Sequence, residues 1–284
     1  RCISCYNHPH VEVRAVIVYL SVLDSQEKKS KFEQIYLTYR KQMYYAAFQI
    51  LQHDEDSEDA VHHAFIKIAE NIEKLQAAHV AVVGLGGVGS YIAEALARSG
   101  VGALTLVDAD EFAPSNINRQ LPALESTIGK LKTEVIAERI SLINPNCKVT
   151  LRSEFYEPGD FDKFFPEALD FVADAIDSTA SKIDLLVECH RRQIPVISSM
   201  GTGNKLDPST LQVADISKTH TCPLAKSVRK RLRMAGIDKG VAVVFSTENP
   251  MYASKEAVPG SMVFVPASAG LLIASHIVRK LIGV

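Results

Sequence analysis

The sequence has almost no net charge, because 33 acidic residues balance 31 basic ones and leave a formal net charge of −2. This balance excludes a chain that attracts nucleic acid or anionic membranes through its overall field, so such contacts need a local basic patch. Long apolar runs are also lacking. The run at residues 269–274 is far shorter than the ~20 residues that cross a bilayer, and no signal peptide is evident at the start. We therefore expect a soluble, cytoplasmic protein with no membrane partner.

Cysteine is scarce and odd in number. Of the five cysteines only Cys2 and Cys5 lie close together, so we expect reduced thiols rather than a disulfide framework. Apolar residues, in contrast, are plentiful: 47% of the 284 residues are hydrophobic and 23% are charged. Such a chain can bury a sizeable core, which excludes a disordered protein and allows one large domain or two unequal ones.

The pattern of apolar residues changes near residue 77. Before it, residues 32–50 and 61–75 carry apolar positions at spacings of three and four, and an acidic cluster at residues 54–59 precedes the second stretch. These patterns predict two antiparallel amphipathic helices. After it, short runs rich in Val, Ile and Leu alternate with helical stretches. We therefore expect a helical segment over residues 1–76 and a second domain over residues 77–284.

The second domain has the sequence pattern of an α/β fold. Its candidate buried strands are residues 80–83, 104–107, 148–152, 171–175 and 195–198, and the segments between them are long enough for crossover helices. This alternation predicts a mostly parallel, doubly wound sheet with helices on both faces.

A glycine-rich turn follows the first of these strands. The string GLGGVG at residues 84–89 places Gly84, Gly86 and Gly89 between a strand and a helix. A bare backbone turns tightly there, admits phosphate oxygens and directs helix N–H groups at them. Asp108, at the end of the next strand, is placed to accept hydrogen bonds from ribose hydroxyls. The pattern predicts a nucleotide site.

The residues that follow favour a triphosphate over a dinucleotide. The strings SNINRQ at residues 115–120 and GKLKTE at residues 129–134 bring cations close to the glycine turn. Cations suit a departing pyrophosphate, because they stabilise the negative charge that its departure concentrates. Asp177 follows another predicted strand, where a carboxylate could hold Mg²⁺ between phosphates.

Together these strings resemble a known family. Residues 78–284 are similar to the ThiF/MoeB/HesA branch of the ubiquitin-activating enzyme superfamily, and within it most similar to the tRNA threonylcarbamoyladenosine dehydratase group. The strings that carry the resemblance are VGLGGVGS at 83–90, LVDAD at 106–110, NINRQ at 116–120, INP at 143–145, DAIDS at 174–178 and FSTE at 245–248. The resemblance implies a Rossmann-like domain that joins AMP to a carboxylate, with ATP and Mg²⁺ as cofactors.

The resemblance also implies roles for individual residues. Arg119, Lys132 and Asp177 are the expected catalytic residues, Asp177 being the metal ligand, and Lys130 is an alternative to Lys132. Asn118, Arg119 and Lys132 are expected to contact phosphates. The full set expected to bind the nucleotide is Gly84, Gly86, Gly87, Gly89, Asp108, Asp110, Asn116, Asn118, Arg119, Gln120, Lys132, Asp177 and Ser178.

Two activities fit such a domain. Relatives that adenylate a ubiquitin-like sulfur carrier often have two C-x-x-C pairs for zinc, and residues 78–284 have none. Strings such as MGTGNKLDP at residues 200–208 instead resemble the dehydratase group, which implies cyclisation of threonylcarbamoyladenosine in tRNA. The resemblance further implies a homodimer and leaves open a sulfur-relay partner. A basic stretch could contact tRNA phosphates, or could be a solvated helix face: Lys226, Arg229, Lys230, Arg231 and Arg233.

The N-terminal segment resembles a different family. Residues 32–75 are similar to the start of region 2 of an extracytoplasmic-function sigma factor, through FEQIY at 32–36 and EDAVHHAF at 58–65. In that family this helical hairpin binds RNA polymerase. The promoter-reading part that should follow is missing, so we do not expect polymerase contact by residues 32–75. A polymerase-binding module with an inactive Rossmann passenger remains a second alternative to the enzyme.

Overall fold

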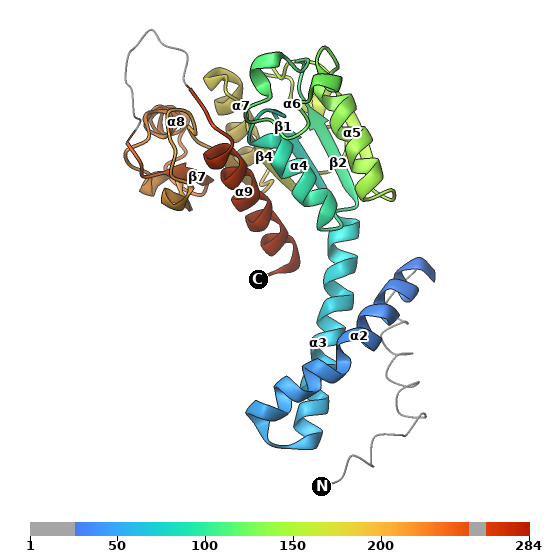
Figure 1. Cartoon of the computed structure of the whole chain (residues 1–284). Helices are drawn as coiled ribbons and strands as arrows, with labels where there is room; N and C mark the ends of the chain where they lie inside the picture. Colours follow the sequence, from blue (N-terminus) through green and yellow to red (C-terminus); the bar gives the residue numbers. More distant parts are fainter. Residues whose placement is uncertain (1–25, 250–259) are drawn as a thin grey trace. The chain divides into compact units, whose positions relative to one another are not determined.

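The computed structural model describes residues 26–249 and 260–284 (Figure 1). Cys2 and Cys5 lie outside these residues. The chain divides into two compact units, Arg1–Lys74 and Leu75–Val284.

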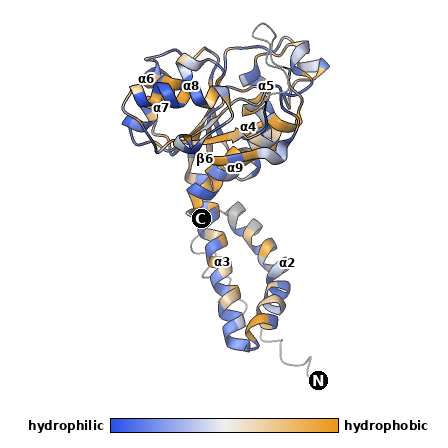
Figure 2. Cartoon of the chain, turned by 90° about the vertical axis from the view of Figure 1, so that its left-hand side faces the viewer, coloured by the Kyte–Doolittle hydropathy of each residue, from blue (hydrophilic) through white to orange (hydrophobic). Residues whose placement is uncertain are grey.

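The first unit contains the predicted helix α2 (Gln26–Leu51) and all but the last three residues of the predicted helix α3 (Asp54–Ala77), and both helices mix hydrophilic and hydrophobic residues (Figure 2). The helices pack through a small apolar cluster that includes Phe32, Tyr36 and Phe65, with the rings of Phe32 and Phe65 edge to face at 5.9 Å. The predicted stripe is longer than the cluster. Tyr39 and Ile50 are 50% and 82% exposed, whereas Met43 and Tyr44 of the same helix are partly buried against the cluster.

The second unit is built on a seven-stranded sheet in the order β3-β2-β1-β4-β5-β7-β6. The pairs are parallel except β6–β7, which is antiparallel. The five predicted strands are confirmed, within one residue at their ends, and β6 and β7 are additional. The strands are β1 (His79–Val83), β2 (Ala103–Val107), β3 (Lys148–Arg152), β4 (Phe171–Asp174), β5 (Val196–Ser199), β6 (Leu211–Asp215) and β7 (Ala242–Ser246).

Helices cover both faces of this sheet, as predicted for a doubly wound α/β fold. One face packs against α4 (Gly89–Arg98), α5 (Lys132–Ile143) and α9 (Phe264–Ile282), and the other against α6 (Phe161–Phe164), α7 (Thr179–Arg191) and α8 (Pro223–Met234). Short 3₁₀ turns complete the unit at Pro114–Asn116, Glu125–Thr127, Pro208–Thr210 and Ile216–Lys218.

Strand alternation explains these two cores. Val80 and Val82 of β1 belong to the core under α4 and α9, whereas Ala81 and Val83 belong to the core under α7 and α8. Since successive strand residues point to opposite faces, a strand covered on both sides must be apolar throughout. The continuous run of β1 satisfies this requirement, which is why the sequence predicted it.

Helix α9 is long and apolar enough to cross a membrane by length and composition alone. In the structure one side of it is buried in the sheet core through residues such as Ala269, Ile273 and Ile277. Gly270 lets it approach α4 closely, because a Cβ there would lie 2.6 Å from the carbonyl oxygen of Val88. These contacts are those of a core helix.

Candidate active site

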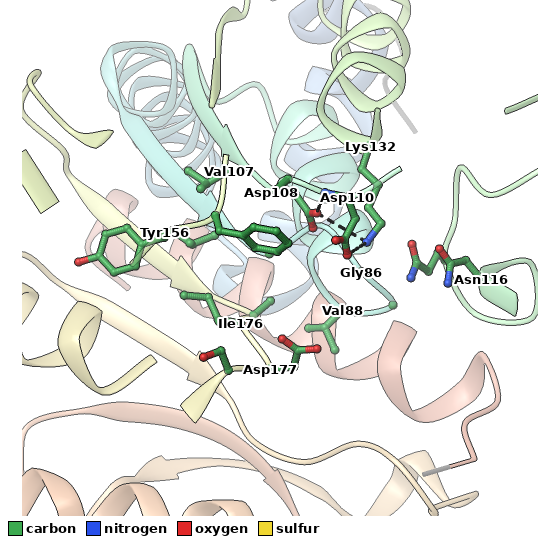
Figure 3. A pocket seen from close by; sticks show the side chains of 18 of the residues that line it. Gly86, Val88, Val107, Asp108, Asp110, Asn116, Lys132, Tyr156, Ile176 and Asp177 are labelled. Atoms are coloured by element: carbon green, nitrogen blue, oxygen red, sulfur yellow. Dashed lines mark hydrogen bonds and ion pairs between the residues drawn. The ribbon is translucent and has the colours of Figure 1, made fainter. Parts of the chain in front are cut away.

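A cleft opens at the carboxyl ends of the central strands. Strand β1 pairs with β2 on one side and with β4 on the other, so the chain changes direction across the sheet at this point. Open α/β sheets bind ligands at such a switch point. The cleft encloses about 700 Å³, and Figure 3 shows the side chains that converge on it.

The glycine turn forms the floor of this cleft. Gly84 has φ +87°, and a Cβ there would lie 2.6 Å from the carbonyl oxygen of Ala175. Gly89 is tighter still, since its Cβ would lie 1.7 Å from the carbonyl oxygen of Gly84. A Cβ at Gly86, in contrast, would have only Gln120 Nε2 near it, at 3.8 Å. Gly84 and Gly89 therefore shape the turn, whereas Gly86 leaves open space on the cleft side.

Asp108 ties the end of β2 to this turn. Its Oδ2 accepts a hydrogen bond from the backbone N–H of Leu85 at 2.6 Å, and its Oδ1 accepts one from the backbone N–H of Asp110 at 2.9 Å. Burial raises the pKa of Asp108, while the nearby Lys132 and the two backbone donors oppose that rise. The carboxylate is thus fixed in place beside the cleft, where ribose hydroxyls could donate to it.

The two predicted cations differ in their environment. Lys132 is buried, and its Nζ lies 2.7 Å from Asp110 Oδ2 and 3.6 Å from Asp108 Oδ1 (Figure 3). Arg119 donates from Nη1 to the carbonyl oxygen of Ser115 at 2.7 Å and to Asn118 Oδ1 at 3.0 Å. Both of these acceptors are neutral. Arg119 therefore keeps its positive charge available to a ligand, whereas two carboxylates offset the charge of Lys132.

Asp177 lies on the turn between β4 and α7, across the cleft from Asp110 (Figure 3). Ser178 follows it and is the residue that precedes the first turn of α7. Within the described residues no group of three or more His, Cys, Asp or Glu side chains could hold a metal ion by itself. Magnesium commonly binds through one or two carboxylates together with substrate phosphates, so a site with Asp177 as its main protein ligand fits that ion.

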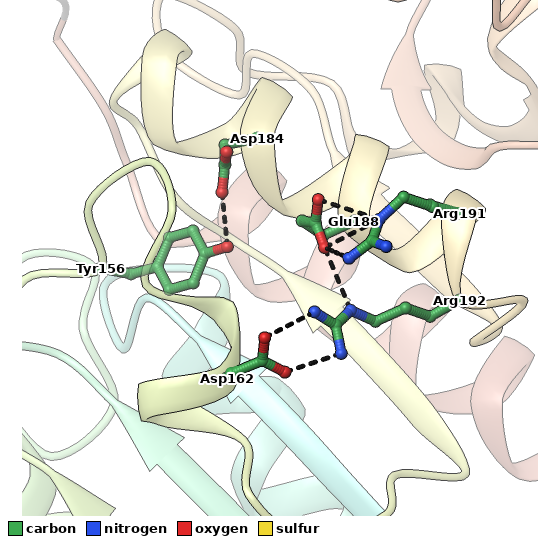
Figure 4. Close-up of polar contacts among 6 residues, drawn as sticks. All are labelled: Tyr156, Asp162, Asp184, Glu188, Arg191 and Arg192. Carbon is green, nitrogen blue, oxygen red and sulfur yellow. Dashed lines mark hydrogen bonds and ion pairs between the residues drawn. The ribbon is translucent and has the colours of Figure 1, made fainter.

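A loop after β3 forms a wall of the cleft that the sequence does not predict. Residues 154–157 line the cleft, and Phe155 is 66% exposed there. The hydroxyl of Tyr156 donates to Asp184 Oδ2 on α7 at 2.7 Å (Figure 4). Burial raises the pKa of Tyr156 well above its usual range, and the hydrogen bond to Asp184 raises this pKa further. The loop is thereby anchored to α7, and no short motif in the sequence marks it.

Figure 4 also shows how α7 is fixed beside this loop. Arg192, which follows α7, pairs with Asp162 at 2.7 Å and with Glu188 at 3.0 Å, and its guanidinium lies 4.5 Å from the centre of the Phe161 ring. These contacts are on the surface, and they join α7 to the segment that carries α6.

Most of the predicted nucleotide-binding residues line the cleft. Asn118 and Gly89 do not. Asn118 instead donates from Nδ2 to the carbonyl oxygen of Ser261 at 2.7 Å and accepts from Arg119, so it orients its neighbours. Lys130, the alternative to Lys132, is exposed and does not line the cleft either. The predicted residues that line it are Gly84, Gly86, Gly87, Asp108, Asp110, Asn116, Arg119, Gln120, Lys132, Asp177 and Ser178.

Three further lining residues come from distant segments. Thr202 and Gly203 follow β5, and Ser261 precedes α9. The backbone N–H of Asn204 donates to the carbonyl oxygen of Gly260 at 2.7 Å, and the N–H of Gly260 donates to Asn204 Oδ1 at 2.8 Å. This reciprocal pair holds the two segments together at the mouth of the cleft.

The basic stretch forms α8, away from this cleft. Lys226, Arg229, Lys230 and Arg233 recur at helical spacing and line a second groove together with the exposed Met234. Arg231 is exposed but does not line that groove. Four of the five predicted cations thus share one face, and the fifth points elsewhere.

Known proteins are similar to this chain in sequence and in fold. The model of the ThiF family matches residues 60–284. The tRNA threonylcarbamoyladenosine dehydratase of Bacillus subtilis is 47% identical over 229 residues, which cover 75% of this chain and 90% of that protein. The crystal structure of the Escherichia coli tRNA dehydratase TcdA with AMP matches with a TM-score of 0.72 and 40% identity, covering 75% of this chain and 90% of that one. The ATP complex of the same enzyme matches with a TM-score of 0.71 and 36% identity, covering 86% and 95%.

Proposed function

The chain belongs to the ThiF family, and on this premise we propose that it is an ATP-dependent tRNA threonylcarbamoyladenosine dehydratase. The observation that carries the proposal is the glycine turn beside Arg119, whose charge no carboxylate of the described residues offsets. Relatives that match three quarters or more of this chain carry that name, and solved structures of one contain AMP or ATP. ATP is therefore the nucleotide that the cleft accepts.

The reaction has two steps. The carboxylate of the threonyl group attacks the α-phosphorus of ATP, the bond to the bridging oxygen breaks, and pyrophosphate leaves. The carbamoyl group of the same nucleoside then attacks the activated acyl carbon, and AMP leaves with the carboxylate oxygen that attacked. A proton is released and a ring is closed. No nucleophile of the protein is needed, so positioning and charge stabilisation supply the rate enhancement.

Different residues of the cleft position the substrates and stabilise the developing charge. Backbone N–H groups at the start of α4 face the phosphates, because a helix N-terminus favours anions. Asp108 accepts hydrogen bonds from the ribose, and Arg119 stabilises the charge that develops as pyrophosphate departs. Lys132 keeps Asp108 and Asp110 together at the end of β2 and adds positive charge behind them. Asn118 holds Arg119 in position.

The site also fits Mg²⁺, which would be held by the carboxylate of Asp177 with the hydroxyl of Ser178 close by. When bound between phosphates, the ion supplies positive charge that neutralises them. Asp177 is exposed and makes no hydrogen bond or ion pair to the rest of the described chain. Its carboxylate is thus available for a ligand.

The test is turnover by purified protein with ATP and Mg²⁺. We expect pyrophosphate release to rise with tRNA that carries threonylcarbamoyladenosine, and mass spectrometry of the nucleosides to show the cyclic product. The control is the same tRNA without the modification, which should not stimulate release. Stimulation by a Gly-Gly-ended carrier protein would instead indicate a sulfur-carrier activator, and co-purification with RNA polymerase without turnover would indicate a polymerase-binding module.

We further propose that the tRNA contacts α8. The groove residues Lys226, Arg229, Lys230 and Arg233 give one helix face a local positive charge that the chain as a whole lacks. Arg229 is held by hydrogen bonds to Thr219, so it is partly structural. Lys230→Glu should weaken tRNA binding and reduce its salt dependence, because it removes one phosphate contact.

Arg231→Glu is a matched control for this proposal. It reverses the same charge, one residue along, on a side chain that does not line the groove. Equal losses of tRNA affinity in both variants would mean that only the net charge matters. Unchanged affinity and salt dependence in the Lys230→Glu protein would remove α8 from the interface.

We propose a homodimer in the cytoplasm, where ATP and tRNA are found. The outward side of α9 supports self-association, because Phe264 and Leu271 are 53% and 52% exposed. The described cysteines do not support a sulfur-relay partner. Cys189 and Cys222 are buried, and burial raises the pKa of the half-buried Cys147 to about 11, which disfavours its thiolate.

Within the described residues, the helical segment contributes no side chain to the cleft. The family match begins at residue 60, within α3, and so includes part of the segment that resembles a sigma factor. All residues that line the cleft lie in the unit Leu75–Val284. We propose that this unit carries the adenylation chemistry.

A further inference from the structure

A buried group of polar residues lies beneath the cleft, at the end of β4. Asp174 and Lys182 are both 0% exposed, and Lys182 Nζ lies 2.7 Å from Asp174 Oδ2. The hydroxyl of Ser198 donates to the same oxygen at 2.5 Å, and Lys182 donates to the carbonyl oxygen of Ser199 at 3.2 Å. Strand β4, strand β5 and helix α7 are thus joined through one carboxylate.

The other oxygen of Asp174 faces the cleft turn. Oδ1 accepts a hydrogen bond from the backbone N–H of Ile176 at 3.0 Å. The turn is also held by the N–H of Ala175, which donates to the carbonyl oxygen of Val83 at 2.8 Å, and by the carbonyl oxygen of Ser178, which accepts from the N–H of Lys182 at 3.0 Å. Residues 175–178 are therefore fixed from both ends and from the Asp174 side chain.

This turn carries Asp177 and also contacts the glycine turn. The carbonyl oxygen of Ala175 is the atom that a Cβ at Gly84 would strike, at 2.6 Å. Asp177 itself has no side-chain partner in the described chain. Its carboxylate consequently points where the backbone of the turn directs it, and a shift of residues 176–178 would displace it. The glycine turn is held separately, because Asp108 accepts a hydrogen bond from the backbone N–H of Leu85 at 2.6 Å.

A gain in folding stability does not by itself explain why the Asp174–Lys182 ion pair is buried. Taking two charges out of water is costly, and replacing a buried ion pair by apolar residues of similar volume often leaves stability equal or higher. The pair is also asymmetric in its contacts, since one carboxylate oxygen is committed to Lys182 and Ser198 while the other is committed to a cleft backbone N–H. Such an arrangement fixes direction as well as position.

We propose that Asp174 is a positioning residue for the Asp177 turn, and that Lys182 and Ser198 hold Asp174 in the required orientation. The proposal rests on the function proposed above, in which Asp177 holds Mg²⁺ with the phosphates of ATP. Neither Asp174 nor Lys182 lines the cleft. Their effect reaches the reaction only through the backbone of residues 175–178.

Two uncharged double variants separate positioning from stability. Asp174→Leu with Lys182→Met removes the ion pair and also the acceptor for the N–H of Ile176. Asp174→Asn with Lys182→Met removes the same charges but keeps a carbonyl oxygen that can accept that hydrogen bond. The second protein is the matched control, because its net charge and its residue 182 are identical to those of the first.

Three measurements are made on the full chain: the Mg²⁺ concentration for half-maximal pyrophosphate release, the affinity for ATP without divalent cations, and hydrogen exchange of residues 175–178. In the leucine variant we expect the half-saturating Mg²⁺ to rise about 10- to 100-fold, as for a displaced catalytic group. ATP affinity without the ion should change less than about threefold. Exchange should accelerate at residues 175–178. The asparagine variant should stay close to the parent in all three.

Equal behaviour of the two double variants, or a loss of metal-free ATP affinity in step with the Mg²⁺ response, would overturn the proposal. Should the leucine variant fail to fold, Ser198→Ala provides the test. It removes a single hydroxyl from Asp174 and should raise the half-saturating Mg²⁺ by about two- to tenfold, and no change would overturn the proposal. A parent protein without pyrophosphate release would refute the proposed function, whereas hydrogen exchange still decides whether Asp174 holds the turn.

Discussion

Two glycines of the same turn should respond to alanine in different ways. A Cβ at Gly89 would lie 1.7 Å from the carbonyl oxygen of Gly84, about half the distance of an ordinary contact. The backbone of the turn must move to accommodate it, and overpacking of this kind costs about 1–3 kcal/mol of unfolding free energy. A Cβ at Gly86 meets only Gln120 Nε2, at 3.8 Å, so it fits the empty protein.

The two variants therefore separate folding from binding. Gly89→Ala should lower both the free energy of unfolding and the affinity for ATP. Gly86→Ala should leave the free energy of unfolding within about 0.5 kcal/mol of the parent, yet weaken ATP binding, because its methyl group occupies the side of the turn that phosphate approaches. Urea unfolding measures the first quantity and titration calorimetry with ATP measures the second.

A Gly86→Ala protein with parental ATP affinity would mean that phosphate does not approach the turn at that residue. A Gly89→Ala protein with parental stability would mean that the turn adopts another conformation in solution.

Three further perturbations test other parts of the molecule. Since burial raises the pKa of Asp108, ATP affinity should fall with decreasing pH already above the usual range of an aspartate, as the carboxylate acceptor becomes protonated. The Asp108→Asn protein should bind ATP more weakly, and its affinity should not show this fall with decreasing pH. If the fall persists in the variant, another group is responsible for it. Arg119→Ala should lower kcat for pyrophosphate release about 10²- to 10³-fold, as for other lost charge-stabilising donors, and a parental rate would contradict its role. Phe65→Ala should lower the unfolding free energy of the helical unit by about 3–5 kcal/mol, measured by the loss of the helical circular dichroism signal. ATP affinity should stay unchanged if the Leu75–Val284 unit binds the nucleotide alone.

The sequence predicted the centre of the sheet and missed one edge. The run of β1 is apolar at every position because both faces of that strand are covered, and such runs are visible without a structure. Strand β6 shows Gln212 and Val213 to solvent and gives no comparable run. Strand β7 is buried, but its antiparallel partner β6 is separated from it along the chain by the whole of α8. Nothing local in the sequence indicates that pairing.

The candidate site shows the same division between local and distant signals. The glycine turn and Asp108 were predictable because a short motif encodes them, with all members on adjacent elements. Tyr156, Thr202 and Ser261 reach the cleft only because the fold brings three separate segments together. The offset of the Lys132 charge by Asp110 was equally hidden, since 22 residues separate the two side chains.

An isotope experiment tests adenylation of the carboxylate most directly. The threonyl carboxylate of threonylcarbamoyladenosine in tRNA is labelled with ¹⁸O, and the nucleotide products are analysed by mass spectrometry after turnover. If that carboxylate captures the adenylyl group and ring closure then expels it, the AMP formed must carry one ¹⁸O atom. Unlabelled AMP, or ADP together with labelled phosphate, would contradict this mechanism.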